Sequence, residues 1–141
     1  MKISEYIQYD AMGLAELIKQ KQITPYELLN LVKRILNNIN PKLNAVSNIF
    51  FDKAEKQLET LDLSAPLAGV PFAIKDLGVL YEGTVTTNGS RYFSQGASDH
   101  SSEIINRYLN AGLIIFGKTN TPEMGVSYTT EPTFTGPTHN P

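Results

Sequence analysis

GVPFAIKD, at residues 69–76, places two charged residues directly behind a short apolar run. The length and composition of Val70–Ile74 are those of a buried strand. A second apolar run, Leu113–Phe116, follows a helical pattern that spans residues 102–111 and ends at Gly112, a residue that suits the position after a helix. Strand, helix and strand in this order predict an α/β fold with a largely buried sheet.

Two further helical patterns precede this strand-helix-strand segment. Asp10 stands where it can cap the first of them. The second has a full start signal in TPYE, residues 24–27, with Thr24 as the N-cap and Glu27 completing a capping box. Its apolar stripe continues to Asn40-Pro41, where the proline is expected to stop the helix. We therefore expect two helices packed by their apolar stripes near the N-terminus.

The remaining patterns predict one partial domain in three stretches. The domain spans residues 1–141, and its first stretch, residues 1–62, is mainly helical. Residues 66–118 follow as strand, loop, helix and strand. Residues 119–141 form an irregular connection rich in proline and threonine. Within the first stretch we expect a short strand at residues 45–51. A third helix, capped by Asp52, is expected to run to about Leu61.

Composition excludes several classes of site. The 141 residues contain no cysteine and two histidines, so a disulfide scaffold, a cysteine nucleophile and a thiolate metal site are excluded. A net charge of −2 argues against nucleic-acid binding. No apolar run is long enough to cross a bilayer, and residues 1–6 show no signal-peptide pattern. We expect a cytoplasmic protein with no metal, cofactor, nucleic-acid or membrane partner.

Two motif matches are rejected on physical grounds. GLIIFGKT, residues 112–119, fits the phosphate-binding pattern G-x-x-x-x-G-K-[ST]. A helix precedes this segment, however, and the bulky apolar residues between the glycines are typical of a buried strand. Ser98, Asp99 and His100 contain the letters of a catalytic triad, but sequence neighbours seldom have triad geometry.

Two lysines stand at the ends of apolar strands, Lys75 and Lys118. A cationic side chain in this place must reach solvent, pair with a carboxylate such as that of Asp76, or work as a desolvated base. Position alone does not choose between these roles or between the two lysines.

Four segments, in order, resemble the amidase signature family. They read PLAGVPFAIKD at 66–76, TTNGSR at 86–91, AG followed by GKTNTPE within 111–123, and GPTHNP at 136–141. The resemblance implies the N-terminal part of that family's fold, a mixed β-sheet flanked by helices with two or three N-terminal helices. Within the family, the segments look closest to the 6-aminohexanoate cyclic dimer hydrolase branch, which acts on linear or cyclic amides.

The resemblance also implies a mechanism and its residues. The family's catalytic lysine maps to Lys75, and Lys118 maps to a supporting position. In the family, an unprotonated lysine takes a proton from a bridging serine held by a cis peptide bond, which in turn takes one from the nucleophilic serine. Asn120, Ser127 and Thr129 map to active-site support, and the substrate of the full-length enzyme is a small-molecule amide.

The chain departs from the family in one respect. The bridging serine, the nucleophile and the oxyanion loop belong to a G-G-S-S-G-G-S segment, and no such segment occurs in residues 1–141. We therefore expect a truncated portion that carries only the catalytic lysine, is inactive alone and self-associates through exposed core surface. The alternatives are a protein like the amidotransferase component that acts on glutamyl-tRNA and a non-catalytic binding module.

Overall fold

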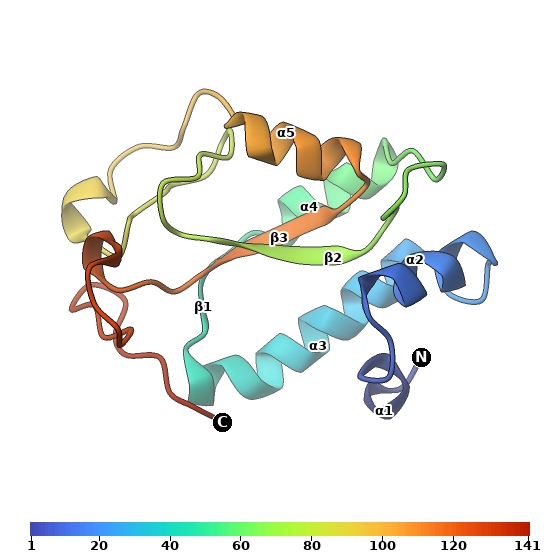
Figure 1. The fold of residues 1–141 in the computed structure, drawn as a ribbon, viewed down its shortest axis with the longest axis horizontal. Helices are drawn as coiled ribbons and strands as arrows, with labels where there is room; N and C mark the ends of the chain where they lie inside the picture. Colours follow the sequence, from blue (N-terminus) through green and yellow to red (C-terminus); the bar gives the residue numbers. More distant parts are fainter. The chain divides into compact units, whose positions relative to one another are not determined.

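The computed structural model describes all 141 residues, which form two units that interleave along the chain. Unit 1 comprises Met1–Ile39, Phe50–Phe72 and Tyr108–Phe116, and unit 2 comprises Asn40–Ile49, Ala73–Arg107 and Gly117–Pro141. The elements in chain order (Figure 1) are α1 Ile3–Tyr6, α2 Ala11–Lys19, α3 Pro25–Leu43, β1 Val46–Ile49, α4 Phe51–Glu59, β2 Pro71–Lys75, the 3₁₀ helix η1 Arg91–Phe93, α5 Glu103–Asn110, β3 Ile114–Thr119 and the 3₁₀ helix η2 Glu123–Gly125.

The starts of α2 and α3 confirm the capping predictions. The Asp10 carboxylate accepts the N–H of Gly13 at 2.8 Å and so caps α2. At α3 the Thr24 hydroxyl oxygen accepts the N–H of Glu27 at 3.2 Å, and the Glu27 carboxylate accepts the N–H of Thr24 at 2.9 Å. Because each cap pairs backbone donors that lack a partner within the helix, sequence spacing alone specifies both starts.

The end of α3 does not follow the prediction, since the helix continues through Pro41. A proline removes only one helical hydrogen bond, and here it lies in the last turn. The helix ends instead at Leu43, and the next residue, Asn44, has a positive φ of 50° and donates its N–H to the carbonyl of Asn40 at 2.7 Å. The Asn40 side chain then accepts the N–H groups of residues 45 and 46 at 3.0 and 2.9 Å. Two asparagines, rather than the proline, turn the chain into β1.

The third predicted helix is present as α4, but Asp52 is not its N-cap. The helix begins at Phe51, whose buried ring stacks on that of Phe116 with 5.6 Å between centroids. Asp52 lies in the first turn, where a carboxylate is favourable to the helix dipole. Aromatic packing therefore places this helix start two residues earlier than the capping pattern predicts.

The three strands form a mixed sheet in the order β1-β3-β2. β1 pairs with β3 in antiparallel fashion. β2 and β3 run parallel, because Ile114 donates its N–H to Val70 at 2.9 Å and Asp76 donates its N–H to Thr119 at 3.1 Å. The predicted α/β class and mixed sheet are confirmed.

The core of unit 1 joins α2 and α3, which lie beside each other in Figure 1 (blue and cyan), to the segments that carry the strands. Its buried members are Leu14, Ile18, Ile23, Leu28, Val70 and Leu113. The predicted packing of the two helices through their apolar stripes is confirmed by these contacts.

The turn from α5 into β3 has the predicted glycine. Gly112 has a φ of 88° and donates its N–H to Leu109 at 2.9 Å, while Leu113 donates its N–H to Tyr108 at 3.1 Å. These two bonds define a Schellman motif, in which the residue after the helix adopts a left-handed conformation that glycine tolerates best.

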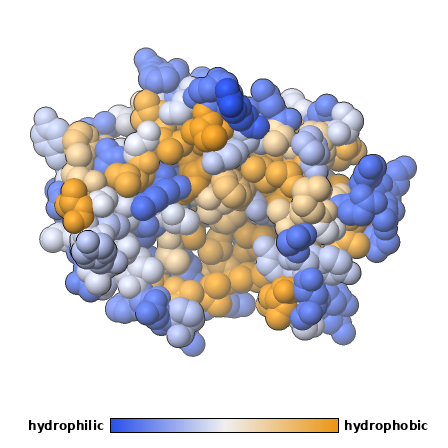
Figure 2. Space-filling view, viewed as in Figure 1, coloured by the Kyte–Doolittle hydropathy of each residue, from blue (hydrophilic) through white to orange (hydrophobic).

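Apolar side chains also reach the surface. Orange apolar residues are interspersed among blue hydrophilic ones on the face seen in Figure 2. Tyr92, Val126 and Tyr128 are among the most exposed large apolar residues. None of the helices has the length and apolar character that crossing a membrane would require.

Candidate active site at the strand ends

The two strand-end lysines differ in burial. Lys75 is the last residue of β2 and is exposed, and its side chain makes neither a hydrogen bond nor an ion pair. Lys118 is completely buried, with 0% of its surface exposed, because β3 is the central strand of the sheet and the lysine side chain ends against Val85 and Thr86. The structure thus separates two residues that the sequence places in the same local pattern.

The Lys118 amino group is hydrogen-bonded within unit 2. Its Nζ donates to the carbonyl of Val85 at 2.7 Å and to the hydroxyl of Thr86 at 2.6 Å. Burial lowers the pKa of Lys118 to about 8, and the nearby Asp76 carboxylate opposes this by raising that pKa. Lys118 is therefore a desolvated amine held by loop atoms.

Asp76 is the second buried charged residue, with 2% of its surface exposed. One carboxylate oxygen accepts the N–H of Thr87 at 2.9 Å, and the other accepts the Thr87 hydroxyl. The Thr87 oxygen in turn accepts the N–H of Gly89 at 3.1 Å. The sequence left open a pairing of Asp76 with Lys75, but the carboxylate is bound to Thr87 and no such pair forms.

Further bonds hold the segment after β2 to the 86–88 segment. The Thr86 hydroxyl donates to the carbonyl of Val79 at 2.9 Å, and the Asn88 side chain accepts the N–H of Gly78 at 2.9 Å. The sequence patterns assigned Thr86 and Asn88 no role. The available signal was a carboxylate directly behind an apolar run, since a buried charge needs partners and hydroxyl-rich TTN supplies them. The run itself is less buried than expected, because β2 is an edge strand in which only Ile74 is buried.

Asn120 connects the end of β3 to the last residues of the chain. Its side-chain nitrogen donates to the carbonyl of Gly136 and to the hydroxyl of Thr138, each at 3.0 Å. Its side-chain oxygen accepts the Thr135 hydroxyl at 2.6 Å. These bonds hold residues 135–138 in place and do not reach Lys75.

Ser127 and Thr129 lie on an exposed part of the chain after η2. Thr129 donates its N–H to the Ser127 hydroxyl oxygen at 3.3 Å, and the two hydroxyl groups are 3.4 Å apart. Neither residue is hydrogen-bonded to Lys75, so the structure joins these two residues only to each other.

The Ser98-Asp99-His100 segment does not form a triad. The Ser98 hydroxyl donates to the backbone carbonyl of His100 at 2.7 Å instead of to its ring. The exposed His100 ring contacts Asp99 at 2.6 Å. Because the Ser98 hydroxyl is bonded to the backbone and not to the imidazole ring, His100 cannot act as its base.

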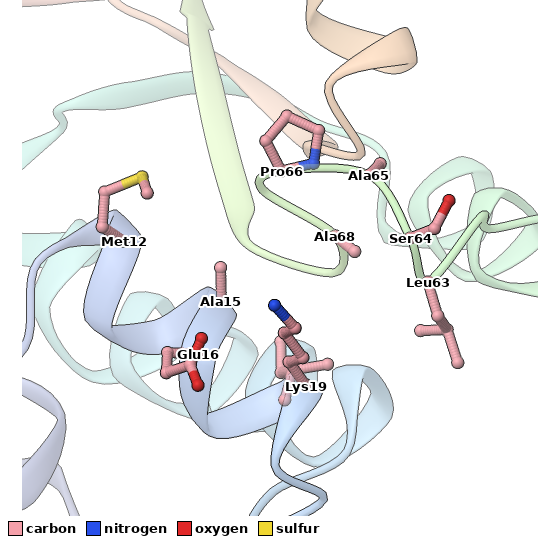
Figure 3. Close-up of a pocket in the computed structure, with 10 residues that line it drawn as sticks. Met12, Ala15, Glu16, Lys19, Leu63, Ser64, Ala65, Pro66 and Ala68 are labelled. Carbon is pink, nitrogen blue, oxygen red and sulfur yellow. The ribbon is translucent and has the colours of Figure 1, made fainter.

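Each unit has a surface hollow. In unit 1, a hollow of about 510 Å³ lies between α2 and residues 63–68, with Glu16, Lys19 and Ser64 as its polar lining (Figure 3). In unit 2, a hollow of about 440 Å³ is lined by Thr86 and Asn88 of the loop network and by the aromatic residues of η1. The unit 2 hollow therefore shares residues with the network around Lys118 and Asp76.

Comparisons with known proteins agree with the motifs. A family model described as Amidase matches residues 27–141. The 6-aminohexanoate-cyclic-dimer hydrolase of Paenarthrobacter ureafaciens is 39% identical over 134 residues, which are 94% of this chain and 27% of the relative. The lipoamidase of Enterococcus faecalis is 35% identical over 123 residues, covering 86% of this chain and 17% of the relative. A glutamyl-tRNA(Gln) amidotransferase component of Lachnospira eligens is 34% identical over 144 residues, covering 96% of this chain and 29% of the relative.

Solved structures place the fold in the same group. The structure of a 6-aminohexanoate cyclic dimer hydrolase complexed with substrate superimposes with a TM-score of 0.89 at 37% identity, over 94% of this chain and 27% of that one. The chain thus spans less than a third of the length of these relatives. Since the family model, the sequence identity and the fold all agree, the chain belongs to the amidase family.

Proposed function

We propose that this chain is the lysine-bearing part of an amide hydrolase of the amidase signature type, with Lys75 as its general base. The match to amide hydrolases along nearly the whole chain carries the proposal. GVPFAIKD supplies the residue-level support, because the family's catalytic lysine maps onto Lys75 at the end of β2. The substrate class is a small linear or cyclic amide.

The proposed reaction is acyl transfer to serine. Unprotonated Lys75 takes a proton from the bridging serine, which takes one from the nucleophilic serine as that oxygen attacks the amide carbonyl. The proton returns to the leaving amine, and water then hydrolyses the acyl-enzyme. Both serines belong to the G-G-S-S-G-G-S segment, which residues 1–141 do not contain. The chain by itself is therefore proposed to be inactive.

The supporting residues have separate parts in this proposal. Asn120 holds residues 135–138 beside the end of β3 through three of its side-chain hydrogen bonds. Ser127 and Thr129 present exposed hydroxyl groups that can contact substrate or neighbouring chain.

A chimeric hydrolase tests the assignment of Lys75. This chain replaces the matching segment of the Paenarthrobacter ureafaciens hydrolase, and hydrolysis of the cyclic dimer is measured. Lys75→Met removes the base and is expected to lower kcat by about 10²–10⁴-fold. Lys75→Arg is expected to be equally inactive, because a guanidinium keeps its proton.

Lys56→Met is the matched control. Lys56 is an exposed lysine on α4, so its loss should leave hydrolysis unchanged. A folded, active chimera in which Lys75→Met retains its activity would contradict the proposal.

A second candidate is a role in amide transfer to glutamyl-tRNA, favoured by the match to the Lachnospira eligens amidotransferase. The same segment replacement in that amidotransferase tests it. If only this second chimera is active, and it supports amide transfer, the amidotransferase role replaces the hydrolase role.

A further inference from the structure

We propose that Lys118 and Asp76 are positioning residues that hold the loop of residues 85–89 across the ends of β2 and β3, and thereby place Lys75. The inference rests on the proposed function of Lys75. It concerns two buried charges that the reaction outlined above does not use.

We call the hydrogen bonds by which Lys118 and Asp76 hold residues 85–89 the clamp. Its first half is Lys118. Its two donated hydrogen bonds, at 2.7 and 2.6 Å, hold consecutive loop residues, Val85 and Thr86. Thr86 passes the restraint on, because its own hydroxyl donates to Val79 at 2.9 Å. Lys118 of β3 therefore fixes the loop directly, and through Thr86 it also fixes the segment that follows β2.

The second half is Asp76. It holds the next loop residue, Thr87, through two hydrogen bonds, and its own N–H donates to Thr119 of β3 at 3.1 Å. Lys75 precedes Asp76 directly in the chain. Any displacement of Asp76 would therefore move the backbone from which the Lys75 side chain extends.

Energetics favour a specific role for this arrangement over simple packing. A buried charge loses hydration, and an apolar residue of similar size fills a strand position without that cost. Both Lys118 and Asp76 are nevertheless almost fully buried, and their opposite charges attract each other. The lysine supplies what an apolar residue lacks, two directed donors and a charge that complements Asp76.

The first experiment follows the backbone amide signals of the 141-residue chain by NMR from about pH 6 to about pH 10. In the native protein the signals of Lys75, Thr86 and Thr87 are expected to titrate together, with a midpoint near the Lys118 pKa of about 8. Lys118→Met should abolish this shared titration and move the Lys75 signal. Asp76→Asn should move the midpoint to lower pH, because the carboxylate that raises the pKa of Lys118 is removed.

Thr84→Val is the matched control. Thr84 is a buried threonine of the same loop region, but its hydroxyl donates to Tyr81 at 2.7 Å and takes no part in the clamp. The control should leave the Lys75 signal and the titration midpoint in place. If the Lys75 signal stays in place in both Lys118→Met and Asp76→Asn, the inference is overturned. If only one of the two variants folds, an unmoved Lys75 signal in that variant overturns it.

The second experiment measures catalysis in the chimera. Thr87→Val deletes the hydroxyl that binds Asp76 and is expected to lower kcat by up to about 10²-fold with little change in KM, while Thr87→Ser restores it. Equal rates for the valine and serine variants would contradict a positioning role. A chimera in which Lys75 is dispensable would refute the proposed function instead, and the NMR result would still decide whether the clamp places residue 75.

Discussion

At the scale of single residues, the most informative side chain is that of Lys118. Its amino group is buried, donates two hydrogen bonds and lies near the carboxylate of Asp76. Desolvation opposes the charged form of the amine, and the carboxylate only partly compensates. The exposed Lys75, by contrast, extends from a strand end where a substrate or further chain can reach it.

The titration of Lys118 predicts how stability depends on pH. Between the folded pKa of about 8 and the ordinary lysine value of 10.5, the unfolded state binds more protons, so the free energy of unfolding rises with pH across this window. The rise for this group amounts to about 3 kcal/mol. It is measured by chemical denaturation at several pH values.

Lys118→Met is expected to lack this rise. Burial raises the pKa of Tyr6, which acts in the opposite direction at higher pH, so the difference between native protein and variant is the quantity to compare. Parallel stability curves for the two proteins would refute a buried, titrating Lys118.

At the scale of elements, close backbone approach decides the junction between α5 and β3. A Cβ on Gly112 would lie 2.7 Å from the Cα of Ala68, in addition to the left-handed φ of 88°. Gly96 has a similar φ of 83°, but a Cβ there meets nothing within 4 Å. A side chain at either glycine would therefore strain the backbone, but only at Gly112 would it also collide with a neighbouring segment.

Gly96→Ala is expected to lower the free energy of unfolding by about 1–2 kcal/mol, the strain of a left-handed alanine. Gly112→Ala should cost about 1–3 kcal/mol more, because the backbone at Ala68 must also move. Urea denaturation measures both. Equal losses would show that the close approach carries no energetic weight.

At the scale of the whole molecule, the chain covers about 27% of the relative from Paenarthrobacter ureafaciens and lacks the family's glycine-serine segment. A fluorophosphonate probe, which labels activated serines, is therefore expected to leave the 141-residue chain unlabelled. The active parent hydrolase serves as the positive control. Stable labelling of the chain, removed by substituting a single serine, would show a nucleophile that the proposed function excludes.

Much of the fold could be predicted because the signals are local. Asp10 and Thr24 cap helices through bonds that span three residues, and Gly112 ends a helix through its own backbone freedom. The predicted end of α3 was wrong, since the chain after Pro41 is turned by the side chain of Asn40, which accepts the N–H groups of residues 45 and 46, and by the positive φ of Asn44. Distant packing, such as the stack of Phe51 on Phe116, likewise leaves no local pattern.

The sequence by itself determined the family, the order of helices and strands from α2 to β3, and the motif that singles out Lys75, because motifs and caps are encoded by neighbouring residues. Only the tertiary structure decided that Lys118 is buried and Lys75 exposed, and that Asp76 binds Thr87. Burial and hydrogen bonding depend on which distant segments meet at the strand ends. Two lysines with the same local pattern can therefore have opposite environments.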